Sequence, residues 1–344
     1  MPSSRTSWKA HCVATGCFHN VAMEYRPLGR TGLSVSAIGY GAWGIGGNMW
    51  IGADDAQSLR ALHRAVDLGV NFIDTAFDYG LGHSETLVGR LVRERREPVF
   101  VATKIPPRNR VWPAAPGVPV SECFPADHIA EYADRSLKNL GRDHVDLMQL
   151  HTWHDSYLDQ DGWRDAFLGL KQSGKARFLG LSVSDHDPGS AMKAVASGIF
   201  DTVQVIFNIF DPSPARELLP ACHEKGVGVL ARVPFDEGAL TGAITPETTF
   251  PEGDFRNQYF GGDRKRQVHE RVQALRGLLG GEAATLPELA LRFCLSHDAV
   301  STVIPGMRRI ASVEANTAAG DGRRLSRRLL EELGRHAWPR NFYS

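Results

Sequence analysis

Four residues whose types suit carbonyl chemistry follow apolar, strand-like runs in the first half of the chain. They are Asp74 and Tyr79 after the run 71–74, Lys104 after the run 98–103, and His151 after the run 145–150. The ends of parallel strands converge when a sheet closes into a barrel. We therefore expect these four side chains to surround one pocket.

Their chemistry fits the transfer of a proton to a carbonyl oxygen. A phenol has a reference pKa of about 10, and a nearby ammonium favours the phenolate and lowers that pKa. We expect Tyr79 to be the acid, Lys104 to lower its pKa, Asp74 to anchor Lys104, and His151 to orient the substrate oxygen. Each residue alone also has a structural reading, as a turn cap, a packed aromatic, a solvated lysine or a buried histidine. Their joint occurrence at successive strand ends favours the chemical reading.

The elements that must position these residues alternate along the chain. Strands are predicted at 37–40, 71–74, 98–103, 145–150, 178–183, 202–207, 228–231 and 301–304. Helices are predicted at 54–68, 83–95, 127–140, 162–173, 189–197, 214–224, 286–296 and 312–319. This alternation predicts an α/β fold, a (β/α)8 TIM barrel, with an N-terminal β-hairpin at 24–36 and extra helices at 263–279 and 326–334.

A doubly wound open sheet is the competing architecture. Gly39, Gly41 and Gly44 have the G-x-G-x-x-G spacing of a dinucleotide-binding turn. That turn requires a helix to start at once, whereas a glycine-rich loop follows here, so we interpret the match as chance. Long segments at 105–125, 151–161 and 235–262 follow predicted strands, where barrel loops build substrate walls and cofactor covers.

Composition and charge exclude several classes of protein. Lys plus Arg (39) equals Asp plus Glu (39) in the 344 residues, which argues against a nucleic-acid binder, and no apolar run is long enough to span a bilayer. The five cysteines form no C-x-x-C pair, which favours a cytoplasmic protein. Residues 1–22 are predicted to be a disordered extension before a barrel domain at 23–344. Their histidines and cysteines (His11, Cys12, Cys17 and His19) are interpreted as incidental rather than as a metal site.

The segment Asn71–Gly80, followed by Ser84, Glu85 and Gly89, resembles the aldo-keto reductase signature around its catalytic Asp and Tyr. Thr103 and Lys104 resemble the lysine strand of that family, and the segment 146–151 its histidine strand. The similarity extends from Tyr25 to the last helix. It implies a (β/α)8 barrel with the catalytic tetrad Asp74, Tyr79, Lys104 and His151, and a nicotinamide cofactor.

The resemblance also implies a site for the nicotinamide and the pyrophosphate. Ser182 and Gln204 match residues that hold the carboxamide, whereas Val183 stands where the family has an asparagine. Arg232 stands where many members have a stacking aromatic, and it could stack on the nicotinamide, reach a phosphate or contact the substrate. The loop residues expected to contact the pyrophosphate, mainly through backbone amides, are Pro234, Phe235, Gly238 and Leu240.

At the adenosine end, the resemblance places Gly306, Arg308, Arg309 and Asn316 beside the cofactor. Asn316 would contact adenine, and either arginine would pair with a 2′-phosphate. The lysine and arginine of the better-known pattern are replaced by Gly306 and Ser312. The two arginines favour NADP, with NAD as the alternative. They could also form a solvated basic turn that contacts no cofactor.

The predicted function is that of an NADP-dependent oxidoreductase for a small aldehyde, ketone or sugar. Its substrate pocket is expected to use Trp43, Trp50 and Trp153, with Trp112 in a further loop, and Asp155 to add polar selectivity. One alternative is a nucleotide-binding regulatory subunit with little turnover, and another is an NAD-dependent sugar 1-dehydrogenase. A barrel hydrolase or isomerase would need a metal or a carboxylate pair, and neither is evident. Physiological substrate, reaction direction and oligomeric state are not encoded.

Overall fold

Eight parallel strands curl into a barrel in the computed structural model, which describes residues 22–339 and Phe342. The sheet order is β10-β9-β8-β7-β6-β5-β4-β3. Its strands are β3 (Tyr40–Gly41), β4 (Phe72–Asp74), β5 (Phe100–Ile105), β6 (Val145–Leu150), β7 (Ala176–Ser182), β8 (Thr202–Ile206), β9 (Gly228–Arg232) and β10 (Val300–Val303). Parallel bridges from Ile38 to Val303 and from Gly41 to Gly306 join the first strand to the last and close the barrel.

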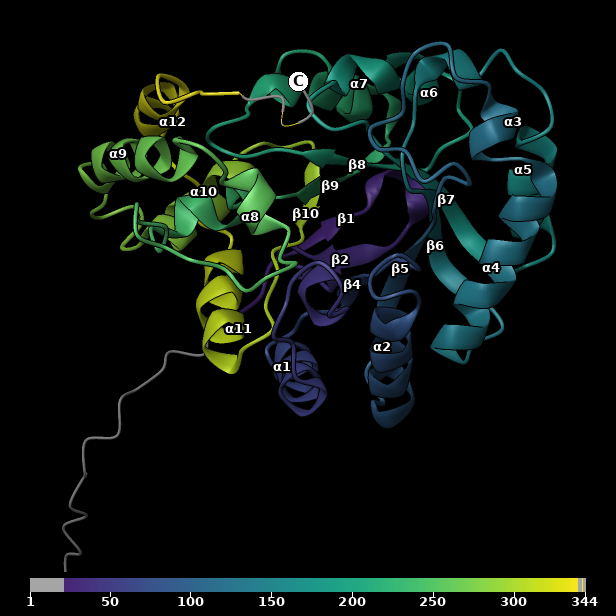
Figure 1. The fold of residues 1–344 in the computed structure, drawn as a ribbon, viewed down its shortest axis with the longest axis horizontal. Helices are drawn as coiled ribbons and strands as arrows, with labels where there is room; N and C mark the ends of the chain where they lie inside the picture. Colours follow the sequence, from purple (N-terminus) through teal and green to yellow (C-terminus); the bar gives the residue numbers. More distant parts are fainter. Residues whose placement is uncertain (1–21, 340–341, 343–344) are drawn as a thin grey trace, which may run out of the picture.

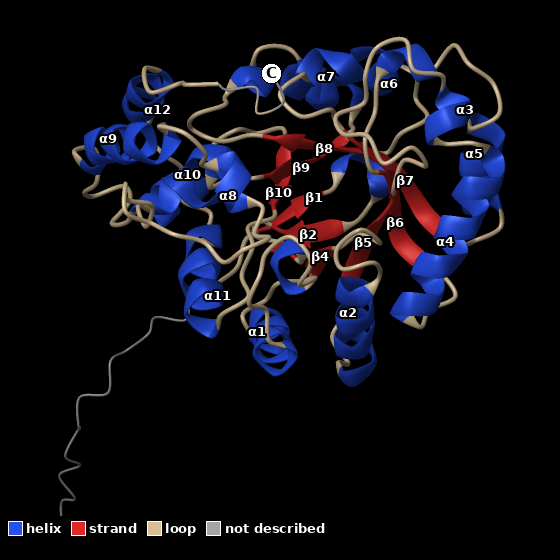
Figure 2. Cartoon of the chain, in the orientation of Figure 1, coloured by secondary structure: helices blue, strands red, loops and turns tan. Residues whose placement is uncertain are grey.

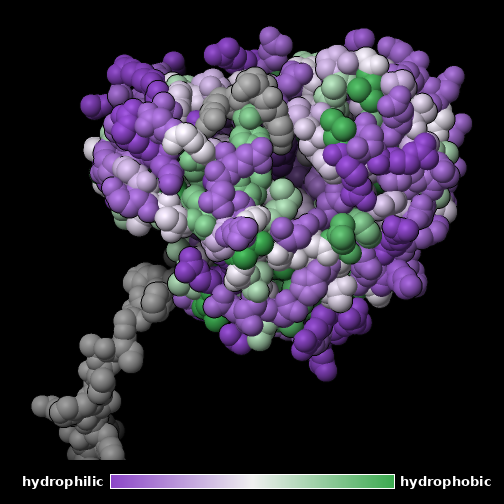
Figure 3. Space-filling view, in the orientation of Figure 1, coloured by the Kyte–Doolittle hydropathy of each residue, from purple (hydrophilic) through white to green (hydrophobic). Residues whose placement is uncertain are grey.

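Helices surround the strands, as Figure 1 and Figure 2 show. Those between successive strands are α1 (Asp55–Asp67), α2 (His83–Glu94), α4 (Ala126–Leu140), α5 (Arg164–Gln172), α6 (Met192–Ala196), α7 (Leu218–Lys225) and α10 (Leu286–Leu295), and α11 (Ile310–Thr317) follows β10. The additional helices are α3 (Val120–Cys123), α8 (Arg256–Tyr259), α9 (Arg264–Arg276) and α12 (Arg327–Gly334). The face seen in Figure 3 is largely polar, with apolar patches between the charged side chains.

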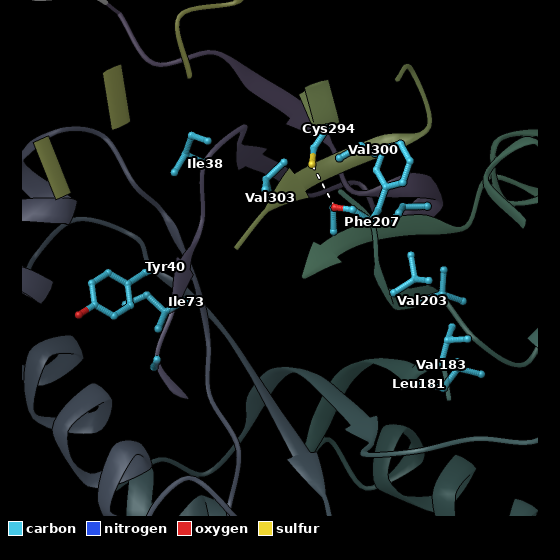
Figure 4. Close-up of a cluster of buried hydrophobic side chains, with 14 of the residues drawn as sticks. Ile38, Tyr40, Ile73, Leu181, Val183, Val203, Phe207, Cys294, Val300 and Val303 are labelled. Atoms are coloured by element: carbon cyan, nitrogen blue, oxygen red, sulfur yellow. Dashed lines mark hydrogen bonds between the residues drawn. The ribbon is translucent and has the colours of Figure 1, made fainter. Parts of the chain in front are cut away.

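The outward-facing side of the barrel packs against these helices through a continuous apolar layer. Ile73, Leu181 and Val203 belong to this layer, and each is completely buried. Figure 4 shows part of it, including the Cys294 thiol directed at the carbonyl oxygen of Phe207. Because strand side chains alternate between two faces, the neighbours of these residues must point into the barrel.

The interior of the barrel is filled in layers. Phe72, Ala102, Leu147 and Leu230, on four of the strands, form a separate buried cluster with residues of the N-terminal hairpin. That hairpin consists of β1 (Tyr25–Pro27) and β2 (Ser34–Ser36). Two residues further along the same strands lie Asp74, Lys104, Gln149 and Arg232, which therefore form the next inward layer, at the carboxyl ends of the strands.

The predicted fold is confirmed, and the differences lie at the edges of elements. Within the barrel, β3 is only Tyr40–Gly41, because the rest of the predicted strand 37–40 joins its neighbour by an isolated bridge. The short helices α3 and α8 were not predicted, since both lie inside long loops whose sequences lack a helical period. Apart from Ala22, the extension predicted at 1–22 and its four candidate metal ligands lie outside the described residues.

Candidate active site

Asp74, Lys104 and Tyr79 form a chain of hydrogen bonds at the carboxyl end of the barrel. The Lys104 ammonium donates to Asp74 Oδ2 at 2.7 Å and to the carbonyl oxygen of Thr75 at 2.9 Å. The Lys104 Nζ also lies 3.0 Å from the Tyr79 hydroxyl. Lys104 is completely buried and Asp74 is 2% exposed. The structure thus brings together the first three residues of the predicted tetrad, in the predicted order of contacts.

Burial dominates the acidity of this group. It raises the pKa of Tyr79 well above its usual value, and the Asp74 charge adds to that rise. Burial also lowers the pKa of Lys104, against the opposing effect of Asp74. The net pKa of Tyr79 therefore lies above its usual value, because the removal of the phenol from water outweighs the effect of the nearby positive charge. Tyr79 is accordingly protonated at neutral pH.

His151 faces Tyr79 across the mouth of the barrel. The two rings meet edge to face with centroids 5.8 Å apart. Burial and the positive charge of Lys104 hold the pKa of His151 well below its usual value, so the imidazole is neutral. Its Nδ1 is buried and has no hydrogen-bond partner among the described residues. A neutral imidazole of this kind can hydrogen-bond a substrate oxygen without adding charge to the site.

Two glutamine amides complete the surroundings of Asp74. Gln204 Nε2 donates to Asp74 Oδ1 at 2.7 Å, and Gln149 Nε2 lies 3.3 Å from the same oxygen. Gln204 was predicted to hold a nicotinamide carboxamide, and its register partner on β7 is Ser182, which is 3% exposed. Gln149 was not singled out by its sequence context. Its inward position follows from the strand period, but its neighbours come from other strands.

Aromatic side chains form walls on two sides of the site. Trp43 lies with its ring centroid 6.2 Å from Tyr79 and 5.8 Å from Trp50. Trp112 meets His151 at 5.7 Å and donates from its indole nitrogen to the His151 carbonyl oxygen at 3.2 Å. The structure thus places Trp43 and Trp50 on one side of the tetrad, and Trp112 on the other.

Trp153, in contrast, does not reach the substrate side. It is completely buried between Tyr157, Trp163 and Phe200, with ring centroids 4.9–5.5 Å away. Its indole nitrogen donates to Asp155, which also accepts the backbone amides at the start of α6. The expectation that Trp153 and Asp155 shape the pocket is therefore wrong. Both anchor the loop after β6 to the outer helices.

The loop after β9 was expected to hold the nicotinamide and the pyrophosphate. Arg232 forms an ion pair with Asp185 and donates to the Val183 carbonyl oxygen at 3.2 Å. Further along, the amides of Gly238 and Leu240 both donate to the Phe235 carbonyl oxygen at 3.0 Å, so these two expected phosphate ligands are engaged within the loop. The loop borders a pocket lined by Asp185, His186, Ile206, Arg232, Val233, Asp236, Glu237, Phe255, Tyr259 and Phe342, whereas Pro234 is not among its lining residues.

The acidic side chains of this pocket are compensated. Asp236 accepts hydrogen bonds from the Tyr259 hydroxyl at 2.6 Å and from Arg264 at 3.1 Å. Burial, followed by the Asp236 charge, raises the pKa of Glu237 to about 8, so Glu237 is largely protonated at neutral pH. Asp185 is paired with Arg232. An anionic ligand entering here would meet little net negative charge.

At the adenosine end, the predicted residues lie around the bridge that closes the barrel. Gly306 is exposed and pairs with Gly41. Arg308 donates to the Ile51 carbonyl oxygen at 3.2 Å, and burial lowers its pKa, as do the nearby charges of Arg256 and Arg309. Arg309 is exposed at the start of α11, whereas Asn316 is 4% exposed within that helix.

Similarity to known proteins agrees with this geometry. The model of the aldo/keto reductase family matches residues 37–336, and the chain belongs to this family of oxidoreductases. The aldo-keto reductase YhdN of Bacillus subtilis is 31% identical over 301 residues, covering 85% of this chain and 87% of that protein. The NADH-specific methylglyoxal reductase of Escherichia coli is 30% identical over 311 residues, covering 86% and 93%.

Solved structures support the same assignment. The holo form of the aldo-keto reductase AKR11C1 from Bacillus halodurans superposes with a TM-score of 0.72 at 29% identity, covering 92% of this chain and 96% of that one. Within the described part of the chain, no cluster of histidines, cysteines and carboxylates is arranged to hold a metal ion. Nor does any described helix have the length and apolar character needed to cross a membrane.

Proposed function

We propose that this chain is an NADP-dependent oxidoreductase that interconverts an aldehyde, ketone or sugar carbonyl and its alcohol, with Tyr79 as the general acid/base. The observation that carries the proposal is the contact of the Lys104 ammonium with both Asp74 and the Tyr79 hydroxyl. A phenol held beside a buried ammonium can release its proton at the moment when negative charge develops on a substrate oxygen.

Each residue of the site then has a distinct task. A bound nicotinamide supplies or accepts the hydride. Tyr79 donates its proton to the carbonyl oxygen in reduction, and Lys104, 3.0 Å away, stabilises the phenolate that remains. Asp74 keeps the ammonium charged and directed at the phenol. Neutral His151 hydrogen-bonds the same substrate oxygen, while Trp43 and Trp112 exclude water from the site.

The loop after β9 is where we place the pyrophosphate of the dinucleotide, because it borders the pocket next to Arg232. Its consecutive residues Asp236, Glu237 and Gly238 have positive φ angles of 47°, 54° and 107°. These residues form a tight turn beside the pocket, and a phosphate would have to replace the bonds that the Asp236 and Gly238 amides make to the carbonyl oxygens of Val233 and Phe235. The compensated carboxyl groups of the pocket remove the main electrostatic objection to a pyrophosphate. Arg232, in place of a stacking aromatic, presents a planar cation to the nicotinamide side.

Arg308 and Arg309 favour NADP over NAD, because guanidinium groups suit a 2′-phosphate. The printed name of the Escherichia coli relative is that of an NADH-specific enzyme, so the opposite preference exists among similar chains. The aromatic walls suit a small apolar aldehyde or ketone, or a sugar whose ring stacks on indole.

The test is a cofactor screen with NADPH and NADH, followed by a panel of aldehydes, ketones and sugars monitored by nicotinamide absorbance. We expect turnover with NADPH, and about a tenfold weaker NADPH affinity in the variants Arg308→Ala or Arg309→Ala with NADH affinity unchanged. A preference for NADH that survives both substitutions would overturn the NADP assignment. Tight cofactor binding without turnover on the whole panel would favour a regulatory subunit instead.

A further inference from the structure

The Asp74 carboxylate is saturated in an unusual way, with one cation and two neutral amides. Its Oδ2 accepts from Lys104, and its Oδ1 accepts from Gln204 at 2.7 Å and faces Gln149 at 3.3 Å. The three donors come from β5, β8 and β6, so the carboxylate joins strands that lie on different sides of the barrel. The same ammonium that Asp74 holds contacts the Tyr79 hydroxyl.

Gln149 occupies a buried position where its amide group lowers the stability of the folded protein, because part of that group is not hydrogen-bonded. It is completely buried and lies directly beside Lys104 in the register of β5 and β6. Its carbonyl oxygen is buried and has no hydrogen-bond partner among the described residues. Leaving such a group unsatisfied costs about 1–3 kcal/mol, so an apolar side chain of the same length would suit the packing better. A purely structural role therefore does not account for an amide at this position.

Gln204 supplies the second amide to Asp74, from the position to which the family resemblance already assigns the nicotinamide carboxamide. It is 1% exposed, and its amide nitrogen is engaged with Asp74. A carboxamide has a donor end and an acceptor end. Because the Gln204 amide nitrogen donates to Asp74, its carbonyl oxygen can accept a hydrogen bond from the carboxamide nitrogen of a nicotinamide bound beside β7 and β8.

We propose that Gln149 is a positioning residue that, together with Gln204, holds the Asp74 carboxylate against Lys104, so that the ammonium stays on the Tyr79 hydroxyl. Neither glutamine touches the reacting oxygen. Gln149 acts only through Asp74, whereas Gln204 acts through Asp74 and on the cofactor. This inference rests on the proposed function, because it concerns the acid of that reaction.

The experiment compares the wild-type protein with Gln149→Met, which keeps the length of the side chain and removes the donor. We expect kcat to fall about tenfold, the equivalent of one hydrogen bond to a charged acceptor. KM and the NADPH dissociation constant, measured by fluorescence titration, should stay within about twofold, because Gln149 faces neither ligand. The melting temperature should be unchanged or higher, since the unsatisfied carbonyl is gone.

Two further variants separate positioning from packing. Gln149→Asn keeps an amide but withdraws it by one methylene, and the same loss of kcat is expected. Gln160→Met is the matched control, because the Gln160 amide accepts from the Val120 amide at 2.8 Å and donates to the Ser156 carbonyl oxygen, neither of which belongs to the tetrad. It should lower the melting temperature and leave kcat intact. Gln204→Met should lower kcat and also weaken NADPH binding, since it loses both contacts.

A solvent isotope effect gives a readout that packing alone would not change. Loosening the proton donor should make proton transfer more limiting, so the ratio of kcat in H2O to kcat in D2O should rise in Gln149→Met. Wild-type kcat in Gln149→Met, or a loss of kcat that parallels a fall in melting temperature, would overturn the proposal. If the wild-type protein itself had no turnover, the proposed function would fail, and the inference with it.

Discussion

At the scale of single residues, the proposed function depends on the proton of Tyr79. Its hydroxyl contacts Lys104, so a phenylalanine at this position removes the acid while leaving the ring between Trp43 and His151. In the variant Tyr79→Phe we expect kcat to fall by about 10²–10⁴-fold, with NADPH affinity within about twofold of wild type. Steady-state kinetics and fluorescence titration check this. Tyr25→Phe, which loses only a hydrogen bond to the Gly69 carbonyl oxygen, is the control. Full activity in Tyr79→Phe would refute the acid assignment.

The raised pKa of Tyr79 also sets the pH dependence of the two reaction directions. A phenol whose pKa lies well above its usual value remains protonated through neutral pH and beyond. Reduction, which needs the protonated form, should keep its kcat/KM from about pH 6 to pH 9. Oxidation needs the phenolate, so its kcat/KM should rise with pH over the same range. Profiles of kcat/KM in both directions test this, and a reduction rate that collapses by about pH 8 would contradict it.

The sequence predicted the four residues of the tetrad because each follows a strand of one barrel, and barrel closure brings strand ends together. It did not single out Gln149, although the two-residue period of β6 places it inward, because Asp74 and Gln204 come from strands far away in the chain. The net rise of the Tyr79 pKa was not predicted, for a related reason. The amount of water removed from a phenol depends on loops that residue types alone do not place.

At the scale of elements, the aromatic residues of the loops after β5 and β6 differ in position. One lines the active site, and the other packs against the outer helices. Trp112, on the loop after β5, packs on His151, whereas Trp153, three residues after β6 ends, is turned away among the outer helices. The sequence placed both in loops at the active face, and it could not tell them apart. Tyr157 and Trp163 follow Trp153 in the same connection between β6 and α5, whereas Phe200 precedes β8, and only the packed structure shows that the three rings close around Trp153.

This division predicts opposite phenotypes for two tryptophans. Trp153→Ala should lower the free energy of unfolding by about 3–5 kcal/mol, because it empties a closed aromatic cluster. Trp43→Ala should leave stability nearly unchanged and raise KM for an aromatic aldehyde by about fivefold to tenfold. Urea unfolding and substrate kinetics on both variants check this. A raised KM in a stably folded Trp153→Ala protein would show that Trp153 lines the pocket after all.

At the scale of the whole molecule, buried arginines tie the ends of the chain to the barrel. Arg26, in the N-terminal hairpin, donates to the carbonyl oxygens of Leu295 and Val300 at 2.7 and 2.8 Å. Arg292, on α10, donates to both oxygens of Asp321 at 2.7 and 2.9 Å and to Glu288 at 2.9 Å. These contacts fix α10 and β10, which in turn complete the closure with β3. Asp74 and Lys104 lie on strands of the barrel that is closed in this way.

The Arg292–Asp321 pair makes the stability of the closed barrel sensitive to acid. Arg292 is completely buried, and its hydrogen bonds hold the pKa of Asp321 below its usual value against the effect of burial. A carboxyl group whose pKa is lowered on folding stabilises the protein above its unfolded pKa of about 4, and this contribution is lost as the pH falls toward the folded pKa. Asp321→Asn should therefore lower the free energy of unfolding by about 3 kcal/mol at pH 7, since it breaks a buried pair.

The difference between Asp321→Asn and the wild-type protein should shrink steadily below about pH 4, because the unfolded wild-type chain then takes up a proton at Asp321 that the folded protein does not. Thermal unfolding of both proteins from pH 3 to pH 7 measures this. Asp159→Asn is the control, because its pair with Lys193 is 3.9 Å long and largely exposed, and such surface pairs contribute little. A difference that is the same at pH 3 and pH 7 would mean that Asp321 acts through its shape and not through its charge.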